Sequence, residues 1–492
     1  MKIKGIIWNI IFIGLFFSLS GFYQNLNDWE SIFSKIKEEV DHHSQVYENL
    51  KRSTETIGHR LTGSLNGKKA EQHTYDLFKS YGYDVKFEEF EVEAWARESV
   101  SLSIAPENSD NYRDLEVVSL AMTPLKSDIS GKIIHLGNGL EGDFEKHQGE
   151  VKGKIVLMNI GLIDAPKGTK NLHRSEKVAI AIEYGAIGVI FINTVKGHVL
   201  LTGTASVTSN LISIPAVCIT LEDGMELKKW LEEKPDLLAE IQMRNTSNLI
   251  KARNVIARLA GTDRKLSKEK IILGGHLDSW DLAQGAIDNG IGSYSVIDIA
   301  RTFKALNLNS KRTIEFVMFM GEEEGLLGSK AFMKKRIEQG NEDEIVYMIN
   351  LDMTNNVYGF NAGGRKEISE IIQSIGKTIQ MVDKDYENGF SNSAGLHSDH
   401  QTFMMEGIPT GWPMGRLEPS VGNCYHANCD SFELVNKKEL EKNVKYTGMF
   451  LYALANLDEF PAKKLNFDET RAFFIQQNLK RELELGNEWK WK

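Results

Sequence analysis

The sequence KEKIILGGHLDSW, from Lys268 to Trp280, contains an apolar run that ends in a cluster of imidazole and carboxylate side chains. The pattern recurs twice: Ile314–Met320 leads into Glu322-Glu323-Glu324, and Ile345–Leu351 leads into Asp352. Helical patterns separate these runs, and this alternation predicts a mainly parallel sheet covered by helices on both faces. Ligands of such sheets bind at the carboxyl ends of the strands. We therefore expect the three clusters at one edge of one sheet.

Each cluster also has an ordinary structural explanation. His276 alone could be a hydrogen-bonded residue, but Asp278 offers the carboxylate that commonly holds the second nitrogen of a metal-bound imidazole. Asp288 lies in an Asp-Asn-Gly turn pattern, and Asp352 could cap a helix. Glu322–Glu324 could be a solvated turn, but it follows a core strand, where carboxylates need a cation to offset their desolvation. Together the clusters predict a metal site.

Length and composition indicate a soluble protein of two or three domains. The chain has 492 residues, of which 41% are hydrophobic and 26% charged. Its net charge of −10 argues against a nucleic-acid partner, because phosphate contact needs a basic face. Three cysteines are too few for a disulfide scaffold, and Cys424 and Cys429 could either pair around His426 or both be free.

The N-terminus has the order of a secretory signal peptide. Lys2 and Lys4 precede the apolar residues 6–17, and small residues follow up to Gly21. The apolar run is short for a membrane-spanning helix. The pattern predicts a signal peptide over residues 1–21, secretion or export to the periplasm, and no stable membrane partner after cleavage. An uncleaved anchor is the alternative.

The rest of the chain divides into regions with different patterns of apolar residues and glycines. Residues 126–245 have short β runs bounded by glycine and lack the metal-type clusters, which predicts a small α/β domain inserted into a larger one. The larger domain then comprises 22–125 and 246–465, and 466–492 form a terminal helix over Glu469–Glu484 with a polar tail. A strand is predicted over 84–93, and the clearest helical patterns cover 67–81, 175–184, 226–233, 292–306 and 329–339.

Five motifs in order resemble those of the di-zinc aminopeptidase and glutamate carboxypeptidase superfamily. They are Gly-His-Leu-Asp-Ser-Trp from Gly275, Ile-Asp-Asn-Gly from Ile287, Glu-Glu-x-Gly-Leu-x-Gly-Ser from Glu322, Asn-Leu-Asp-Met from Asn350, and Tyr-His from Tyr425. Residues 57–64 resemble the N-terminal helix motif of the superfamily, and 126–245 resemble the protease-associated domain that some members insert. The resemblance covers most of 40–460 and is nearest to the plasma glutamate carboxypeptidases. It implies a three-layer α/β peptidase domain with a small inserted α/β domain.

The resemblance also implies a site with two zinc ions per chain. The implied ligands are His276 and Asp352 for one zinc, Glu323 and His426 for the other, and Asp288 as the bridge between them. Glu322 would be the general base that activates the water between the metals, and Asp278 would orient His276. The positions of Gly325 and Gly328 favour Glu322 as base and Glu323 as ligand.

The implied function is a secreted zinc-dependent exopeptidase acting on dipeptides or on terminal residues of short peptides, and relatives suggest a homodimer. The sequence leaves open whether it is an aminopeptidase, a carboxypeptidase or a dipeptidase. Arg416 is a candidate for holding a substrate carboxylate because it falls in a predicted pocket loop. Tyr425 could polarise a substrate carbonyl or simply pack, and His397–His400 could line the pocket.

Two other functions are compatible with this fold. A non-catalytic receptor-like module would share the architecture, but the apparently complete ligand set argues against it. A glutaminyl cyclase of the related single-zinc fold is disfavoured by the inserted domain and by the same ligand set. An assay on peptides with N-terminal glutamine distinguishes a glutaminyl cyclase, which would cyclise that residue, from a peptidase.

Overall fold

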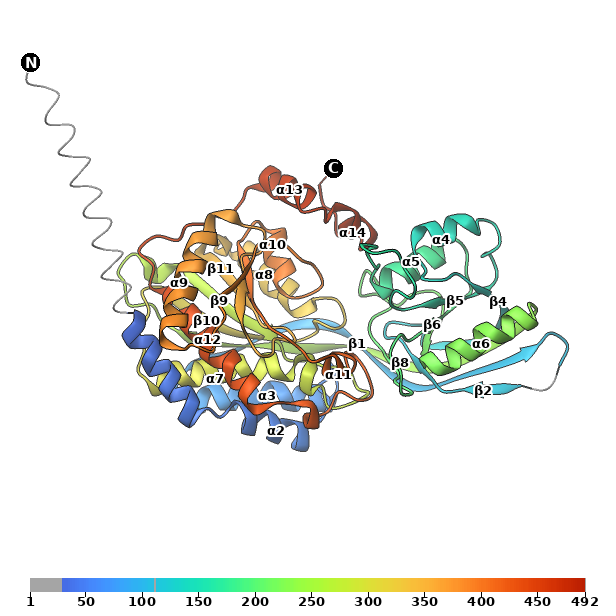
Figure 1. Cartoon of the computed structure of the whole chain (residues 1–492), viewed down its shortest axis with the longest axis horizontal. Coiled ribbons are helices and arrows are strands. Elements are labelled where there is room, and N and C mark those ends of the chain that lie inside the picture. The colour runs from blue at the N-terminus through green and yellow to red at the C-terminus, as the bar shows by residue number, and fades with distance from the viewer. Residues whose placement is uncertain (1–28, 110–111, 492) are drawn as a thin grey trace, which may run out of the picture.

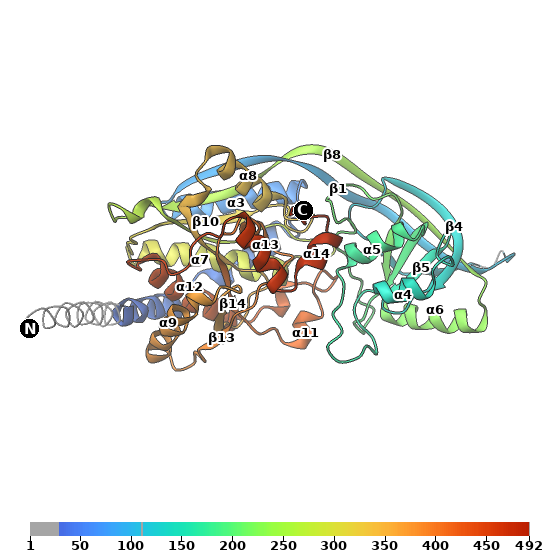
Figure 2. The ribbon, with the colours of Figure 1, turned by 90° about the horizontal axis from the view of Figure 1, so that it is seen from above.

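The computed structural model describes residues 29–109 and 112–491, and these form two lobes (Figure 1). Two long strands, β1 (Asp84–Pro106) and β8 (Leu237–Leu259), pair antiparallel over their full length and run through both lobes (Figure 2). The predicted signal peptide lies outside the described residues. Within the described part, no helix combines the length and the apolar character that a membrane span requires.

The sheet of the larger lobe carries the strands that the sequence predicted. Its order is β13 (Gly389–Ser391), β12 (Gly359–Asn361), β14 (Thr410–Met414), β11 (Ile345–Asn350), β9 (Lys270–His276), β10 (Thr313–Phe319) and β8. Strands β14, β11, β9 and β10 are parallel to one another. Strand β8 is antiparallel to β10, and β12 is antiparallel to β14 but parallel to β13. The continuous apolar runs of β9 and β10 are buried on both faces, as a parallel sheet requires.

Helices cover the two faces of this sheet. One face packs against α2 (Val46–Thr56), α3 (Leu65–Ser80), α7 (Ile291–Ala305), α9 (Ser369–Val382), α12 (Lys437–Ala455) and a helix that includes residues 29–43. The other face packs against α8 (Leu327–Gln339) and α10 (His400–Met405). Alternate residues of β9 serve the two cores, Ile271 and Leu273 on one side and Ile272 on the other. The predicted three-layer α/β fold is confirmed.

The smaller lobe is a separate α/β unit around two cores. Its strands are β2 (Arg113–Leu115), β3 (Val117–Ser119), β4 (Lys126–His135), β5 (Ile155–Asn159), β6 (Gly188–Ile192) and β7 (Ala216–Ile219). Its helices are α4 (Glu141–Lys146), α5 (Arg174–Glu183) and α6 (Leu221–Glu233). The predicted small inserted α/β domain is therefore present, and β2 and β3 of this lobe lie before its predicted start at residue 126.

The predicted domain and helix limits differ from the structure at two places. The strand expected over 84–93 continues to Pro106, and Leu102 and Leu115 pack into the smaller lobe, because the β1–β8 ladder continues from one core to the next across a β-bulge between Arg97 and Ser99. The single helix expected over 469–484 is wrong. It is two helices, α13 (Phe467–Gln476) and α14 (Lys480–Leu485), and Asn478 between them has a left-handed backbone with φ 59°.

Candidate metal centre

Asp288 lies between two pairs of side chains at the carboxyl edge of the sheet. Its Oδ1 is 3.2 Å from His276 Nε2, which is 3.3 Å from Asp352 Oδ1. Its Oδ2 is 3.0 Å from His426 Nε2, which is 2.9 Å from Glu323 Oε2. The five residues predicted as ligands thus lie together, with one His–carboxylate pair at each oxygen of Asp288. Their role as ligands stays a prediction.

The sheet explains why residues so distant in sequence meet. Strand β9 ends at His276, and its parallel neighbours β10 and β11 end shortly before Glu323 and Asp352. The pairing of His276 with Phe319 in the ladder sets the register of the first two strands. Asp288 comes from the short turn Ala286–Gly290 that leads into α7.

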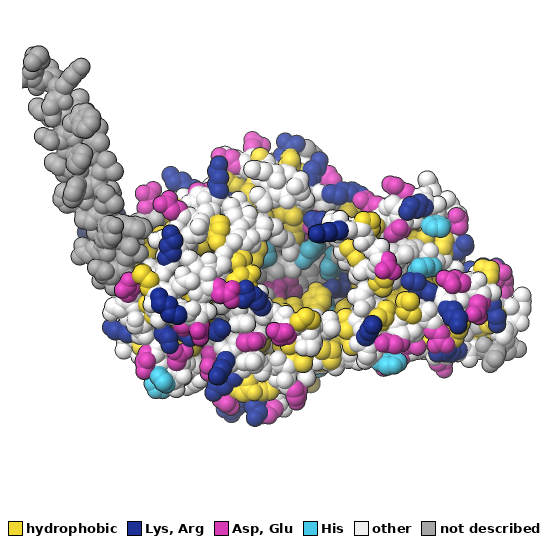
Figure 3. All heavy atoms as spheres, viewed as in Figure 1, with side chains coloured by type: hydrophobic (Ala, Val, Ile, Leu, Met, Phe, Trp, Pro, Cys, Tyr) yellow, Lys and Arg dark blue, Asp and Glu magenta, His cyan; other side chains and the backbone are white. Residues whose placement is uncertain are grey.

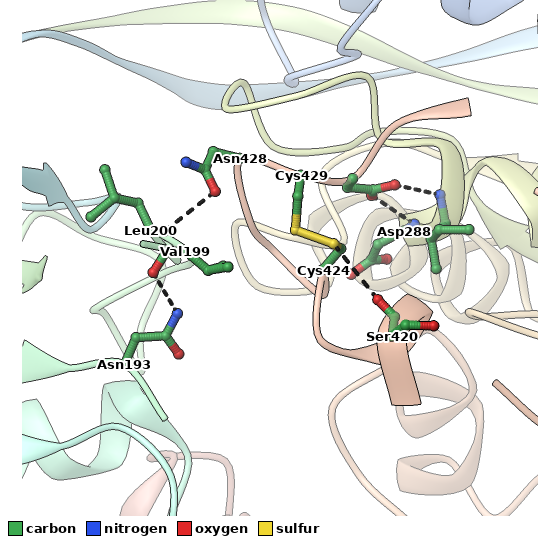
Figure 4. The surroundings of a disulfide bond; sticks show 10 residues. Asn193, Val199, Leu200, Asp288, Ser420, Cys424, Asn428 and Cys429 are labelled. Atoms are coloured by element: carbon green, nitrogen blue, oxygen red, sulfur yellow. Dashed lines mark hydrogen bonds between the residues drawn. A yellow bond between two sulfur atoms is a disulfide. The ribbon is translucent and has the colours of Figure 1, made fainter. Parts of the chain in front are cut away.

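His426 comes from a loop closed by a disulfide bond between Cys424 and Cys429. The structure thus favours pairing, which the sequence had left open. The loop follows the short helix α11 (Pro419–Gly422) and contacts the smaller lobe, where Asn428 Oδ1 accepts a hydrogen bond from Leu200 N–H at 3.3 Å (Figure 4). The smaller lobe therefore supports the segment that carries His426.

Asp278 holds the glutamate turn as well as facing His276. Its Oδ1 accepts a hydrogen bond from Glu322 N–H at 3.3 Å, and its Oδ2 accepts one from Glu323 N–H at 3.1 Å. His276 Nδ1 is 3.8 Å from Asp278 Oδ1 but only 3.2 Å from the main-chain carbonyl oxygen of the same residue. The predicted orienting role stays a prediction, and positioning of the turn is an addition that the sequence did not indicate.

Two further side chains hold the ligand candidates in place, and sequence reasoning missed these roles. The Asp430 carboxylate accepts hydrogen bonds from Ile287 N–H at 2.7 Å and from Asp288 N–H at 3.0 Å. Burial raises the pKa of Asp430 to about 7. Ser398 Oγ donates to Asp352 Oδ2 at 2.7 Å. Outer contacts of this kind fix the orientation of metal ligands.

Arg60 is a third residue that the sequence did not single out. Its buried guanidinium donates from Nε to the Leu277 carbonyl at 2.6 Å, from Nη1 to the Gln284 carbonyl at 3.1 Å and from Nη2 to the Gly285 carbonyl at 2.8 Å. It therefore fixes both ends of the loop that brings the chain from β9 to Asp288. Arg60 belongs to the motif at residues 57–64. Through these hydrogen bonds that motif holds a loop more than two hundred residues further along the chain.

The electrostatics of the cluster fit a divalent cation. Burial and neighbouring carboxylates raise the pKa of Glu322 and Glu323 well above the usual range. Burial alone would lower the pKa of His276, but Asp352 and Glu322 outweigh it and raise that pKa. Glu323 Oε1 and His426 Nδ1 are buried with no hydrogen-bond partner among the described residues. The cluster has more buried carboxylates than cations to pair with them. Together with the two imidazoles, these carboxylates form a donor set that suits Zn²⁺.

The cluster forms part of the wall of a cavity of about 460 Å³ between the lobes. Figure 3 shows a hollow at this place with histidine side chains inside it. Glu322 and Glu323 line the cavity, whereas Glu324 is buried outside its lining. The smaller lobe contributes residues 173–176 and parts of 204–209 to the wall, and the C-terminal region contributes Glu482, Leu483, Gly486 and Glu488. The three adjacent glutamates therefore have different surroundings.

The remaining pocket predictions have mixed outcomes. Of the His397–His400 segment, all residues except Asp399 line the cavity. Tyr425 also lines it and stacks on His426, with ring centroids 3.8 Å apart. The choice of Arg416 as a carboxylate-binding residue is wrong. Its guanidinium is on the surface and outside the cavity lining, because it pairs with Glu387, with Nη2 2.7 Å from Oε2, and lies over the Tyr358 ring.

Comparison with known proteins agrees with this architecture. Residues 254–451 match the model of peptidase family M28, and residues 127–227 match the PA-domain model. The chain carries a family M28 peptidase domain with an inserted PA domain. The predicted superfamily and its inserted domain are therefore confirmed, and so is the general prediction of a peptidase.

Individual relatives extend the match over most of the chain. Carboxypeptidase Q of Mus musculus is 23% identical over 87% of this chain and 93% of its own length. The crystal structure of a peptidase M28 precursor from Shewanella amazonensis has a TM-score of 0.75 at 22% identity and covers 90% of this chain and 100% of that one. A zinc aminopeptidase from Bacillus subtilis has a TM-score of 0.63 at 22% identity and covers 86% of this chain and 98% of that one. The two structures share the fold of this chain.

Proposed function

We propose that this protein is a zinc-dependent exopeptidase that hydrolyses dipeptides or removes terminal residues from short peptides. The observation that carries the proposal is the pair of His–carboxylate contacts at the two oxygens of Asp288. His276 and Asp352 would hold one zinc, and Glu323 and His426 the other, with Asp288 shared. The family match favours this reading over the receptor-like and glutaminyl cyclase alternatives.

The chain's own residues supply the proton transfers. When bound, zinc polarises a carbonyl group and lowers the pKa of water from about 15.7 to about 7. Glu322 lines the cavity and is next to Glu323 in sequence, which supports its proposed role: its carboxylate would accept the proton of the attacking water and deliver it to the leaving amine. Asp278 fixes that turn through the two main-chain N–H groups, which keeps the base in position.

The surroundings of Arg174, a residue of the smaller lobe, support the proposal that the substrate has a free carboxylate. The residue lines the cavity and is only 7% exposed, and its Nε is buried with no hydrogen-bond partner. Nη1 lies 3.5 Å from Tyr425 Oη. Among the described residues no carboxylate lies within ion-pair distance of Arg174, although its charge partly offsets the rise that burial causes in the pKa of Glu323. A buried guanidinium needs an anionic partner, and its planar shape suits a carboxylate. We infer that the α-carboxylate of a short peptide is that partner.

Arg174→Met is expected to lower kcat/KM for free-acid dipeptides by about 10- to 100-fold, because a hydrogen bond to a charged group contributes about 1.5–3 kcal/mol. The same dipeptides with an amidated C-terminus should change little. The measurement is kcat/KM for both substrate forms in wild type and variant, with the exposed Arg416→Met as control. A preference for the free acid that survives in Arg174→Met contradicts the assignment. N-acetylated dipeptides, tested alongside, show whether the amine is needed as well.

Export and assembly complete the proposal. The signal-type N-terminus supports secretion or a periplasmic location, and the Cys424–Cys429 bond fits an oxidising compartment. A homodimer, and the absence of nucleic-acid and stable membrane partners, stay predictions.

A further inference from the structure

The C-terminal strap, residues 477–491, bridges the two lobes beside the cavity. Figures 1 and 2 both show α14 next to α5 of the smaller lobe, whereas α13 before it lies on the larger lobe. Glu482, Leu483, Gly486 and Glu488 of the strap line the same cavity as Glu322. The strap is therefore one wall of the candidate active site.

On the larger lobe the strap is held by buried apolar contacts. Leu483 and Trp491 are buried in a cluster with Met404 and Phe474. Lys490 Nζ lies 2.7 Å from Glu406 Oε1. Burial of such large side chains stabilises this attachment by several kcal/mol.

Glu488 links the strap to the inner wall of the cavity. It pairs with Lys330, with Nζ 2.6 Å from Oε1, and it accepts a hydrogen bond from Gln401. Gln401 Oε1 in turn accepts from His397 N–H at 2.8 Å, and the His397 ring stacks on His173 of the smaller lobe, with centroids 4.9 Å apart. Both lobes and the strap thus meet at one place in the wall.

On the smaller lobe the strap is held mainly by exposed charges. Arg481 pairs with Glu141, and Lys170 pairs with Glu482. In the first pair Arg481 is 58% and Glu141 43% exposed, and such exposed ion pairs contribute only about 0.2–1 kcal/mol. In the second pair Lys170 is 65% exposed, whereas Glu482 is 14% exposed. Leu485 adds a partly buried contact to the core of the smaller lobe. The strap is therefore firmly fixed on one side and weakly latched on the other.

We propose that the strap limits the length of the peptide that the cavity accepts. This inference rests on the proposed exopeptidase function. In this proposal a dipeptide occupies the cavity of about 460 Å³ without moving the strap, whereas a longer peptide runs past Glu482 and Leu483 in its wall and releases the latch between α14 and the smaller lobe. Only long substrates then bear the free-energy cost of releasing the strap, so the pairs Arg481–Glu141 and Lys170–Glu482 act as specificity determinants.

The test compares kcat/KM for a dipeptide and for a hexapeptide with the same reacting bond. Lys170→Glu/Arg481→Glu makes both latch contacts repulsive, and the hexapeptide-to-dipeptide ratio should rise about five-fold or more. Lys132→Glu is the matched control, because it disrupts exposed pairs with Glu107 and Asp236 within the smaller lobe. Glu141→Arg combined with Arg481→Glu should return the ratio toward wild type relative to Arg481→Glu alone.

An unchanged ratio in the double variant, or no recovery in the charge swap, overturns the inference. Hydrogen–deuterium exchange of residues 173–176 gives a readout that does not depend on activity. Exchange should be faster in Lys170→Glu/Arg481→Glu than in wild type. In Glu141→Arg/Arg481→Glu it should return toward the wild-type rate relative to Arg481→Glu alone. Unchanged exchange contradicts a latch at this place. If zinc-loaded wild type hydrolyses neither peptide, the proposed function fails, and the exchange result still decides the latch.

Discussion

Glu322→Gln is expected to lower kcat for dipeptide hydrolysis by about 100- to 10,000-fold, the range that a positioned general base contributes. The amide has nearly the same shape as the carboxylate but cannot take a proton from water. Glu322 lines the cavity and is not one of the proposed ligands, so the zinc content should stay at the wild-type level. The measurement is kcat together with metal per chain in the same preparation.

Glu324→Gln is the matched control for that experiment. Glu324 is the nearest carboxylate in sequence after Glu323, but it is buried outside the cavity lining. Its replacement should leave kcat within a few-fold of wild type in protein that is folded. Wild-type turnover in Glu322→Gln would falsify its role as base, and loss of zinc in that variant would make it a ligand instead.

Arg60→Met is expected to destabilise the larger lobe by about 3–5 kcal/mol, because each buried carbonyl left without a donor costs about 1–3 kcal/mol. The variant leaves the carbonyl groups of Leu277, Gln284 and Gly285 without their donors, and buried unsatisfied groups carry a desolvation penalty. The effect corresponds to a fall in Tm of roughly 4–7 °C for a lobe of this size. Thermal unfolding monitored by circular dichroism measures it.

The exposed Arg416 supplies the comparison for Arg60. Arg416→Met removes a surface ion pair with Glu387, so its effect should stay below about 1 kcal/mol. If Arg60→Met unfolds at the wild-type temperature, the guanidinium does not hold the loop before Asp288. The loss of stability in Arg60→Lys should fall between those of Arg60→Met and Arg416→Met, because one ammonium cannot reach three separate carbonyls as a planar guanidinium does.

The core of the site was predictable because the apolar runs that form strands are local patterns. Their alternation with helical patterns predicts that the strands are parallel. Buried apolar runs gave β9, β10 and β11, and parallel strands end at one edge, so His276, Glu323 and Asp352 had to lie near one another. His426 has no such pattern. Only the resemblance to a known superfamily connected it with the others.

Other parts depend on contacts that no local pattern encodes. Arg60 reaches main-chain groups more than two hundred residues away, and Arg174 comes from a lobe with no visible chemistry of its own. Arg416 looked suitable from its loop, yet its side chain turned to the surface. The helix break at Asn478 likewise depends on one left-handed residue, which a helical pattern across 469–484 conceals.

The central claim is that the side chains around Asp288 hold the zinc that hydrolysis requires. The most direct test is zinc content and dipeptide hydrolysis measured on one preparation before chelation, after exhaustive chelation and after zinc is restored, in wild type and in Asp288→Ala. The account predicts about two zinc per wild-type chain, loss of hydrolysis on chelation and recovery with zinc, and little zinc or activity in the variant. Full hydrolysis by demetallated protein, or wild-type zinc content in Asp288→Ala, would contradict it.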